Sequence, residues 1–218
     1  MDIYWGGQAL FKLKGKQASV IIDPFDPEFT NLKLPKDLIA DVVLSTHSHN
    51  DHNNSKAVSL PEGKSPMVFD LPGEYEVNGV VITGINSFHD NSQGSERGKN
   101  IIFHLLFEGL NIVHLGDLGQ SQLTEAQIAQ ISATDILLIP VGGIYTIDAK
   151  AAAGIISQLE PSIIIPMHYK IEELKAELDP VDKFLKEMGA EGVVVQPKLS
   201  ITKDKLPEEP QIVVLSKV

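Results

Sequence analysis

The chain contains no cysteine. Its 218 residues can therefore form no disulfide bond and offer no thiolate ligand, so any metal site must be built from nitrogen and oxygen donors. The absence of cysteine also fits proteins that work in a reducing compartment. We therefore expect a cytoplasmic protein.

Long apolar runs are also missing. The sequence has no stretch of about eighteen apolar residues and no basic segment followed by an apolar one, so it predicts neither a transmembrane span nor a signal peptide. Hydrophobic residues still make up 43% of the chain, which is enough to bury one sizeable core. We expect residues 1–218 to form a single domain.

Positive charge is scarce. Eighteen lysines and arginines stand against 29 aspartates and glutamates, which gives a net charge of −11. Such a field opposes nucleic acids and anionic membranes, and the sequence has no dense basic run to offset it. We therefore expect a small-molecule substrate, with no nucleic-acid or membrane partner. The sequence leaves the oligomeric state open, a homo-oligomer included.

Metal-ligand residue types, in contrast, are concentrated in one short stretch. Residues 46–52 read Thr-His-Ser-His-Asn-Asp-His and directly follow the apolar run 41–45. Because side chains alternate along an extended backbone, His47 and His49 can reach the same ion. Asp51 and His52 lie further on and can serve a second ion. The stretch is internal and mixed in composition, unlike an expression tag or a solvated loop.

The order His-x-His-x-Asp-His resembles the signature of the metallo-β-lactamase-fold hydrolases. The resemblance extends over about residues 4–168, with supporting stretches at 21–25, 71–79 and 140–148. Within that superfamily the chain is most similar to the small group that includes ascorbate-6-phosphate lactonase-like proteins. The resemblance implies an α/β (α+β) fold, the four-layer αβ/βα sandwich.

The resemblance also implies three further ligands. They are His89 as the third ligand of the first metal, Asp117 as the bridge and His168 as the last ligand of the second metal. Each follows a short apolar run, and site residues commonly gather at such strand ends. The implied cofactors are two divalent ions, with zinc as the default and manganese or iron as alternatives. A hydroxide shared by the two ions would cleave an ester, lactone or phosphodiester, with Asp51 as the catalytic residue that orients it.

One position departs from the family pattern. Relatives usually carry Gly-His near the start, where this chain has Gly7 and Gln8, so a neutral amide replaces an imidazole. Three other function classes share parts of this pattern. A di-iron redox protein would carry Glu at position 49, which is His; a nuclease would carry a large inserted domain; and a non-catalytic metal-binding protein stays open.

Four side chains near these motifs are expected to be structural. His104 lies inside the apolar run 101–107 and is interpreted as a packed strand residue. For Tyr145, Tyr169 and Arg97, packing or surface exposure is favoured over a place in the pocket. His114 has two open interpretations, a hydrogen bond to a ligand or plain structural use.

The segment 91–100 is expected to be a mobile polar loop over the metals. Its only cations, Arg97 and Lys99, are candidate anchors for an anionic substrate, and an ordinary surface loop is the alternative.

Apolar patterning predicts short strands first and helices interleaved later. Strands are expected at 2–5, 9–14, 18–23, 41–45, 67–70, 80–85, 101–107, 110–114, 136–139, 162–165 and 212–215. Helices are expected at 122–132, 149–159 and 180–188, with a weaker one at 171–178. Thr124 and Gln127 fit a capping box, Asp148 fits an N-cap, and Pro180 fits the first helical position.

Overall fold

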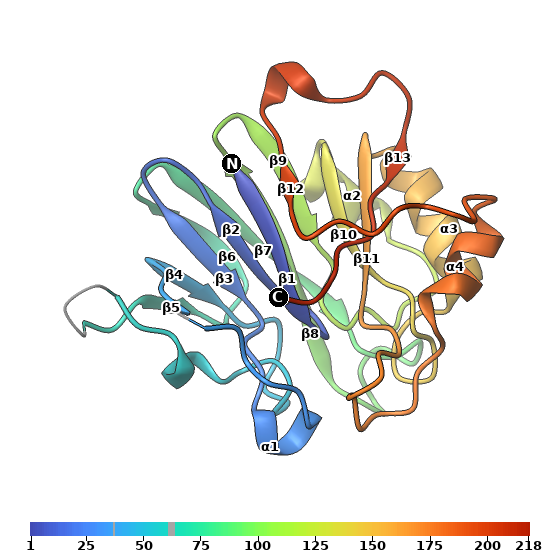
Figure 1. Ribbon diagram of the computed structural model, residues 1–218, viewed down its shortest axis with the longest axis horizontal. Coiled ribbons are helices and arrows are strands. Elements are labelled where there is room, and N and C mark those ends of the chain that lie inside the picture. The colour runs from blue at the N-terminus through green and yellow to red at the C-terminus, as the bar shows by residue number, and fades with distance from the viewer. Residues whose placement is uncertain (37, 61–63) are drawn as a thin grey trace.

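Two β-sheets pack against each other in the computed structural model, which describes residues 1–36, 38–60 and 64–218 (Figure 1). Within these residues the first sheet has the order β12-β1-β2-β3-β4-β5. Its strands are β1 (Asp2–Gly7), β2 (Leu10–Lys14), β3 (Ser19–Ile22), β4 (Val42–Leu44), β5 (Met67–Phe69) and β12 (Leu199–Ser200). The strands β1, β2 and β3 are antiparallel neighbours, whereas β3, β4 and β5 run parallel.

The second sheet has the order β13-β11-β10-β9-β8-β7-β6 among the described residues. Its strands are β6 (Gly73–Val77), β7 (Val80–Phe88), β8 (Lys99–Phe107), β9 (Leu110–His114), β10 (Ile136–Pro140), β11 (Ile163–Met167) and β13 (Gln211–Ile212). The strands β6 to β9 form an antiparallel meander, and β9, β10, β11 and β13 run parallel.

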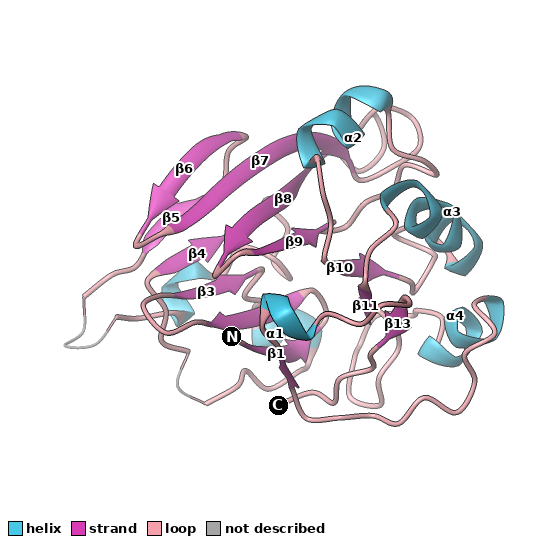
Figure 2. Cartoon of the chain, turned by 90° about the horizontal axis from the view of Figure 1, so that it is seen from above, coloured by secondary structure: helices cyan, strands magenta, loops and turns pink. Residues whose placement is uncertain are grey.

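Three helices lie on the side of the second sheet that faces away from the first sheet (Figure 1 and Figure 2). They are α2 (Glu125–Ile131), α3 (Ala149–Leu159) and α4 (Val181–Glu187). Within the described residues the other helical segments are short: α1 (Pro27–Thr30) and the 3₁₀ turns η1 (Ser55–Ala57) and η3 (Lys203–Lys205). The expected α/β sandwich is confirmed. No helix in the described part of the chain is long and apolar enough to cross a membrane.

Local capping explains where the helices begin. Thr124 and Gln127 form the expected capping box of α2, and the Asp148 carboxylate accepts the Ala151 N–H at the start of α3. Pro180 occupies the N-cap of α4, one position earlier than expected. The helix expected at 171–178 is wrong. In that segment the Lys175 N–H donates a hydrogen bond to the Thr30 carbonyl, and the Lys170 ammonium donates to the carbonyls of residues 174 and 176. These bonds replace the backbone hydrogen bonds between residues i and i+4 that a helix would form.

The strands that the sequence pattern did not predict, or predicted at shifted bounds, all lie at the edge of a sheet. No strand was expected at β6 or β12, and β13 begins and ends before most of the expected 212–215. An edge strand is paired on one side and is often charged, so its apolar pattern is weak. In β6 the alternate residues Glu74 and Glu76 are exposed, which fits this explanation.

The core lies between the two sheets. In β2 the side chains of Phe11 and Leu13 point inward and are fully buried, while Lys12 and Lys14 point outward. Phe103 and Leu105 of β8 face them from the second sheet in the same apolar cluster. This rigid interior fixes the ends of β4, β7, β9 and β11, from which the candidate ligands project.

Candidate metal centre

The loops after four strands bring the seven predicted ligands together in two groups. The first group contains His47, His49 and His89, and the second contains Asp51, His52, Asp117 and His168. Within each group, one nitrogen or oxygen atom per residue lies within 4.8 Å of the others. Residues separated by more than a hundred positions therefore meet at one end of the two sheets, as the sequence predicts.

Asp117 connects the two groups. One of its carboxylate oxygens, Oδ2, lies 3.3 Å from His89 Nε2 of the first group. The same oxygen lies 3.1 Å from His52 Nε2 and 3.3 Å from His168 Nε2 of the second group. Its position between the groups is the one that the bridging interpretation requires.

The donor set fits divalent cations. Two buried atoms of the cluster, His52 Nε2 and Asp117 Oδ1, have no hydrogen-bond partner. His89 Nδ1 and His168 Nδ1 also lack one, but they lie on the opposite side of the ring from the Nε2 atoms that face Asp117. Buried polar atoms without a partner are costly, and a cation held by the imidazoles and carboxylates would offset part of that cost. Imidazole and carboxylate donors suit zinc, manganese and iron.

The charges of the cluster also favour a cation. Burial, helped by the neighbouring His52, lowers the pKa of His47 to about 2, so this imidazole is neutral and able to ligate at neutral pH. Burial opposes ionisation of Asp117, but His168 and His52 outweigh it and hold the pKa of Asp117 well below its usual range. The site therefore presents His47 as a neutral nitrogen donor beside an ionised carboxylate. Burial lowers the pKa of His52, but Asp117, Asp51 and Asp23 outweigh it and raise that pKa well above its usual value, so a bound cation would replace a proton there.

Asp23 supports the cluster from behind, and the sequence analysis missed it. The fully buried Asp23 carboxylate accepts hydrogen bonds from His52 Nδ1 at 2.9 Å and from the backbone N–H and hydroxyl of Thr46, both at 2.8 Å. Thr46 Oγ1 in turn lies 3.0 Å from Nδ1 of His47. One carboxylate thus fixes the ring orientation of a residue in each group. Its sequence signal is an aspartate that directly follows the apolar strand β3.

The loop that carries Asp117 is held by His114 and Asn100. The Gly116 N–H donates to His114 Nδ1 at 3.1 Å, so His114 carries its proton on Nε2, which donates to the Ala9 carbonyl at 2.9 Å. His114 bonds to backbone and to no ligand side chain, which settles its two interpretations in favour of structural use. Asn100, which the sequence analysis did not single out, accepts the Asp117 N–H at 3.0 Å.

Glycines allow the close approach of these loops. Gly116 has a φ of +57°, and a Cβ there would collide with Asn100 Oδ1 and with the side chain of Thr46. A Cβ on Gly119 would collide with the backbone of His89 and Asp90. The glycines around Asp117 therefore let its loop pack against two other ligand loops.

Gln8 reaches the second group from the turn between β1 and β2. Its Nε2 lies 3.2 Å from Asp51 Oδ2 and 3.4 Å from His168 Nε2, while its Oε1 is buried without a partner. The Gln8 carbonyl accepts hydrogen bonds from the Trp5 indole and the His168 N–H. Gln8, at the position where the resemblance implies a histidine, therefore directly contacts two candidate ligands.

A cavity of about 610 Å³ opens over the cluster. Five candidate ligands line it, namely His49, Asp51, His89, Asp117 and His168. Arg97 and Tyr145 also line it, and both side chains are exposed, as expected. Tyr169 does pack as expected, with its ring 4.8 Å from that of Trp5.

Two cations line this cavity, Arg97 and Lys175. Arg97 donates to the Ile144 carbonyl at 3.3 Å and its guanidinium lies 5.8 Å from the centre of the Tyr145 ring. The sequence analysis missed Lys175, which lies in the segment expected to be helical. Lys99, the second cation of the 91–100 loop, lines a neighbouring cavity of about 320 Å³ that Arg97 also reaches.

Asp90 organises the loop that presents Arg97. Its carboxylate, only 3% exposed, accepts backbone N–H groups of Arg97, Gly94, Ser92 and Glu96 at 2.8 to 3.0 Å. These bonds, that of Arg97 first, lower the pKa of Asp90 to about 2 and keep the carboxylate ionised. The loop expected to be mobile is thus wrapped around one buried anion.

His104 has the structural role that its position in the strand predicts. The ring is half-buried on β8, and Nε2 lies 3.2 Å from Asn111 Oδ1. It contacts none of the seven candidate ligands.

Comparison with known proteins gives consistent results. Residues 2–168 match the family model described as a beta-lactamase superfamily domain. A UPF0173 metal-dependent hydrolase of Thermoplasma acidophilum is 31% identical over 215 residues, which cover 89% of this chain and 94% of the relative. A crystal structure from Thermotoga maritima is also similar; it is that of a candidate zinc-dependent hydrolase of the metallo-beta-lactamase superfamily. Its sequence is 39% identical, its TM-score is 0.76, and the match covers 98% of this chain and 97% of that chain.

Proposed function

The chain belongs to the beta-lactamase superfamily domain family and is a metal-dependent hydrolase, and on this premise we propose that it uses two divalent ions to cleave an ester, lactone or phosphodiester bond of a small anionic substrate. His47, His49 and His89 would hold one ion, and Asp51, His52 and His168 would hold the other. Zinc is the first choice, with manganese and iron as alternatives.

The single observation that supports two ions best is the position of Asp117. Its Oδ2 lies within 3.3 Å of ligands from both groups. Seven ligand residues also exceed what one tetrahedral ion uses. When bound, such ions lower the pKa of water and stabilise negative charge that develops on the substrate.

Asp51 is the proposed catalytic residue. It lines the cavity, keeps 15% of its side chain exposed and receives the Gln8 amide on Oδ2 at 3.2 Å. Burial raises its pKa, but the His52 imidazole outweighs this and keeps the pKa of Asp51 below its usual value, so it is ionised at neutral pH. An ionised carboxylate at the cavity floor can accept a proton from the attacking water and orient it.

The cations of the cavity support an anionic substrate. Arg97, the only arginine of the chain, is held on the Ile144 carbonyl and beside the Tyr145 ring, so its guanidinium is partly preorganised. Lys175 adds a second positive charge among the lining residues, while Glu28 and Glu96 add negative ones. The half-exposed Phe29 and Tyr145 can contact an apolar part of the substrate.

The proposal is tested by a screen of the metal-loaded protein. Lactones, carboxylic esters and phosphodiesters are compared, each as an anionic substrate and a neutral analogue, with the Asp51→Ala variant as the control for contaminating activity. Turnover of an anionic substrate that Asp51→Ala lacks supports the proposal. Equal turnover by both proteins, or none across the panel with metals bound, favours a non-catalytic metal-binding protein.

A further inference from the structure

We propose that Gln8 is a positioning residue of the candidate metal centre: its side-chain amide holds the Asp51 carboxylate in the orientation that metal binding and catalysis need. Gln8 lies in the turn between β1 and β2, far in the sequence from the ligands that it contacts. The inference rests on the proposed function, in which Asp51 binds the second ion and orients the nucleophile.

The Gln8 amide nitrogen touches two ligands of the second group. Nε2 lies 3.2 Å from Asp51 Oδ2, to which it donates, and 3.4 Å from His168 Nε2. A hydrogen bond to an ionised carboxylate is stronger than one between neutral groups, so the bond to Asp51 is the stronger of the two contacts. It holds the carboxylate by Oδ2 and leaves Oδ1 for the attacking water.

The neighbouring carboxylate fixes the orientation of the amide. A rotation by 180° about the last side-chain bond would exchange Nε2 and Oε1 and bring the carbonyl oxygen against Asp51. Two oxygen atoms with negative charge repel each other, so the orientation with the N–H groups towards Asp51 is favoured. In this orientation Gln8 Oε1 is buried without a partner in the described structure. Such an acceptor does not stabilise the fold, which favours a functional reason for the amide.

The backbone that presents Gln8 is strained and is joined to the backbone of His168. Both residues have a φ of 51°, in the left-handed region that residues other than glycine rarely adopt. The His168 N–H donates to the Gln8 carbonyl at 3.1 Å, and the Trp5 indole donates to the same carbonyl at 2.8 Å. Strained residues gather at functional sites, where the surrounding structure maintains them. The turn is therefore tied directly to a ligand loop.

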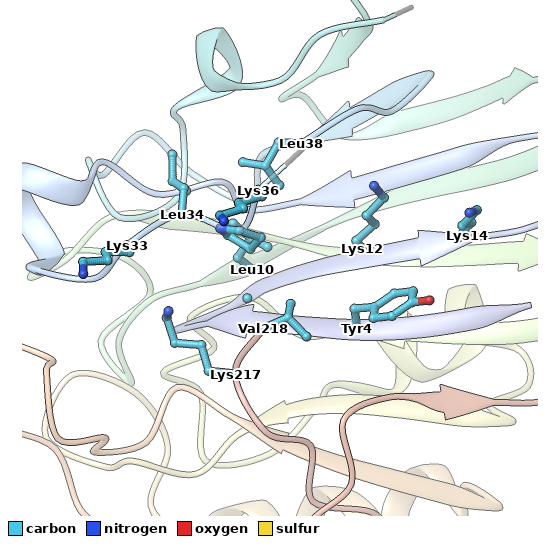
Figure 3. Close-up of a pocket in the computed structure, with 12 residues that line it drawn as sticks. Tyr4, Leu10, Lys12, Lys14, Lys33, Leu34, Lys36, Leu38, Lys217 and Val218 are labelled. Atoms are coloured by element: carbon cyan, nitrogen blue, oxygen red, sulfur yellow. The ribbon is translucent and has the colours of Figure 1, made fainter.

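The rest of the fold anchors this turn. Leu10, the first residue of β2, is 1% exposed and packs in an apolar cluster with Phe25 and Leu32. On the other side of β1 the end of the chain pairs with it, because the Val218 N–H donates to the Trp5 carbonyl at 3.0 Å. Figure 3 shows Leu10 and Val218 around one pocket beside β1 and β2. A turn held in this way can fix a side chain that supports a ligand.

Gln8 acts through Asp51 and not on the substrate. Gln8 lines the cavity but is only 2% exposed, which leaves almost no surface for a substrate group. Asp51 keeps 15% of its side chain exposed in the same cavity. Loss of the Gln8 amide should therefore appear first in the binding of the second ion.

Cobalt binding by the full chain tests this role. Gln8→Met keeps an unbranched side chain of similar length and removes the N–H donor to Asp51. Co²⁺ is added to the metal-free protein, and its affinity is measured by competition with a chromophoric chelator. We expect one of two bound ions to have a Kd about 10- to 100-fold higher in Gln8→Met, with altered visible absorption bands. In the His89→Ala background, which retains the second group, the remaining ion should show the same increase.

Two further variants separate positioning from folding. Gln158→Met removes an amide that bonds twice to the backbone of Leu123, so it should lower thermal stability and leave the Co²⁺ affinities unchanged. Gln8→His places a ring Nε2 the same number of bonds from Cα as the amide Nε2. This variant should restore both the wild-type Kd and the wild-type absorption bands.

Several results would overturn the proposal. Unchanged affinities in Gln8→Met would do so, as would an equal loss in Gln158→Met, which indicates a general effect of stability. Gln8→His would contradict it by failing to restore the Kd, or by restoring it with new absorption bands, which place position 8 on the ion itself. None of these measurements needs turnover. A single Co²⁺ in the wild-type protein would contradict the two-ion proposal, whereas the Kd in Gln8→Met decides the role of Gln8.

Discussion

His52 and Asp23 form a hydrogen bond of 2.9 Å between two fully buried side chains, His52 Nδ1 and Asp23 Oδ2. This bond leaves Nε2 of His52 directed at Asp117 and Asp51, at 3.1 and 3.5 Å. The orientation of a candidate ligand is thus set by a residue 29 positions away that touches no other candidate ligand side chain in the described structure.

Asp23→Asn should weaken metal binding. An amide has one acceptor oxygen and no negative charge. If that oxygen keeps the His52 and Thr46 hydroxyl bonds that Oδ2 accepts, an NH₂ group replaces Oδ1 and faces the Thr46 backbone N–H. We expect the affinity of the His52-containing site to fall about 10- to 100-fold, measured by competition with a chromophoric chelator. Asp41→Asn is the control, because Asp41 accepts two hydrogen bonds from Ser19 far from the cluster and should keep wild-type affinity. Equal affinities in the two variants would contradict the supporting role of Asp23.

Asp51→Ala should abolish turnover while most of the folded core remains. The substitution removes a ligand of the second group and the carboxylate that orients the nucleophile. His104→Gln, in contrast, should leave turnover nearly unchanged, because His104 bonds only to Asn111 on the neighbouring strand. Turnover numbers of both variants, with thermal unfolding as the check on folding, measure this difference. If His104→Gln loses activity as completely as Asp51→Ala, the separation of ligand from structural histidines is wrong.

Arg97→Ala should raise KM for anionic substrates by roughly tenfold, since a charged hydrogen bond contributes about 1.5–3 kcal/mol. Neutral analogues should be little affected. Lys99→Ala is the matched control from the same loop, because Lys99 lines only the neighbouring cavity. An equal effect of Arg97→Ala on charged and neutral substrates would indicate a disturbed loop instead of a lost anchor.

Asp90→Ala should loosen the loop that carries Arg97. Four backbone N–H groups at positions 92–97 lose their acceptor, so hydrogen exchange in this segment should accelerate. KM for anionic substrates should rise together with the exchange rate. Glu96→Ala is the control for hydrogen exchange alone, because the Glu96 carboxylate accepts the Ser92 hydroxyl, whereas loss of its charge from the cavity lining changes KM by itself. Unchanged exchange in Asp90→Ala would show that the loop holds its conformation without this anion.

The sequence predicted the residues whose chemistry is visible locally. The ligands of residues 47–52 share one short motif, and His89, Asp117 and His168 each follow an apolar strand, so the pattern of strand ends pointed to the site. Asp23 and Asn100 were missed because each acts through a partner that only the fold brings near. Lys175 was missed because only the fold places it at the cavity. A lone aspartate after β3 has no distinguishing pattern until His52 is seen to point at it.

The fold was predictable to a similar degree and for similar reasons. Strands with two neighbours are apolar and were found within a few residues, whereas β6 and β12 at sheet edges were missed. The helix expected at 171–178 failed because contacts with Thr30 and Lys170, which no local pattern records, replace its hydrogen bonds. Capping of α2 and α3 depends on adjacent residues and was predicted correctly.

The metal content of the purified, reconstituted protein tests the central claim most directly. Elemental analysis after dialysis against metal-free buffer should give two divalent ions per chain, because the seven ligands form two groups joined by Asp117. His89→Ala should reduce the content to about one ion while the second group stays filled. A reproducible content of one ion or none in the wild-type protein, with the fold intact by circular dichroism, would contradict the binuclear account.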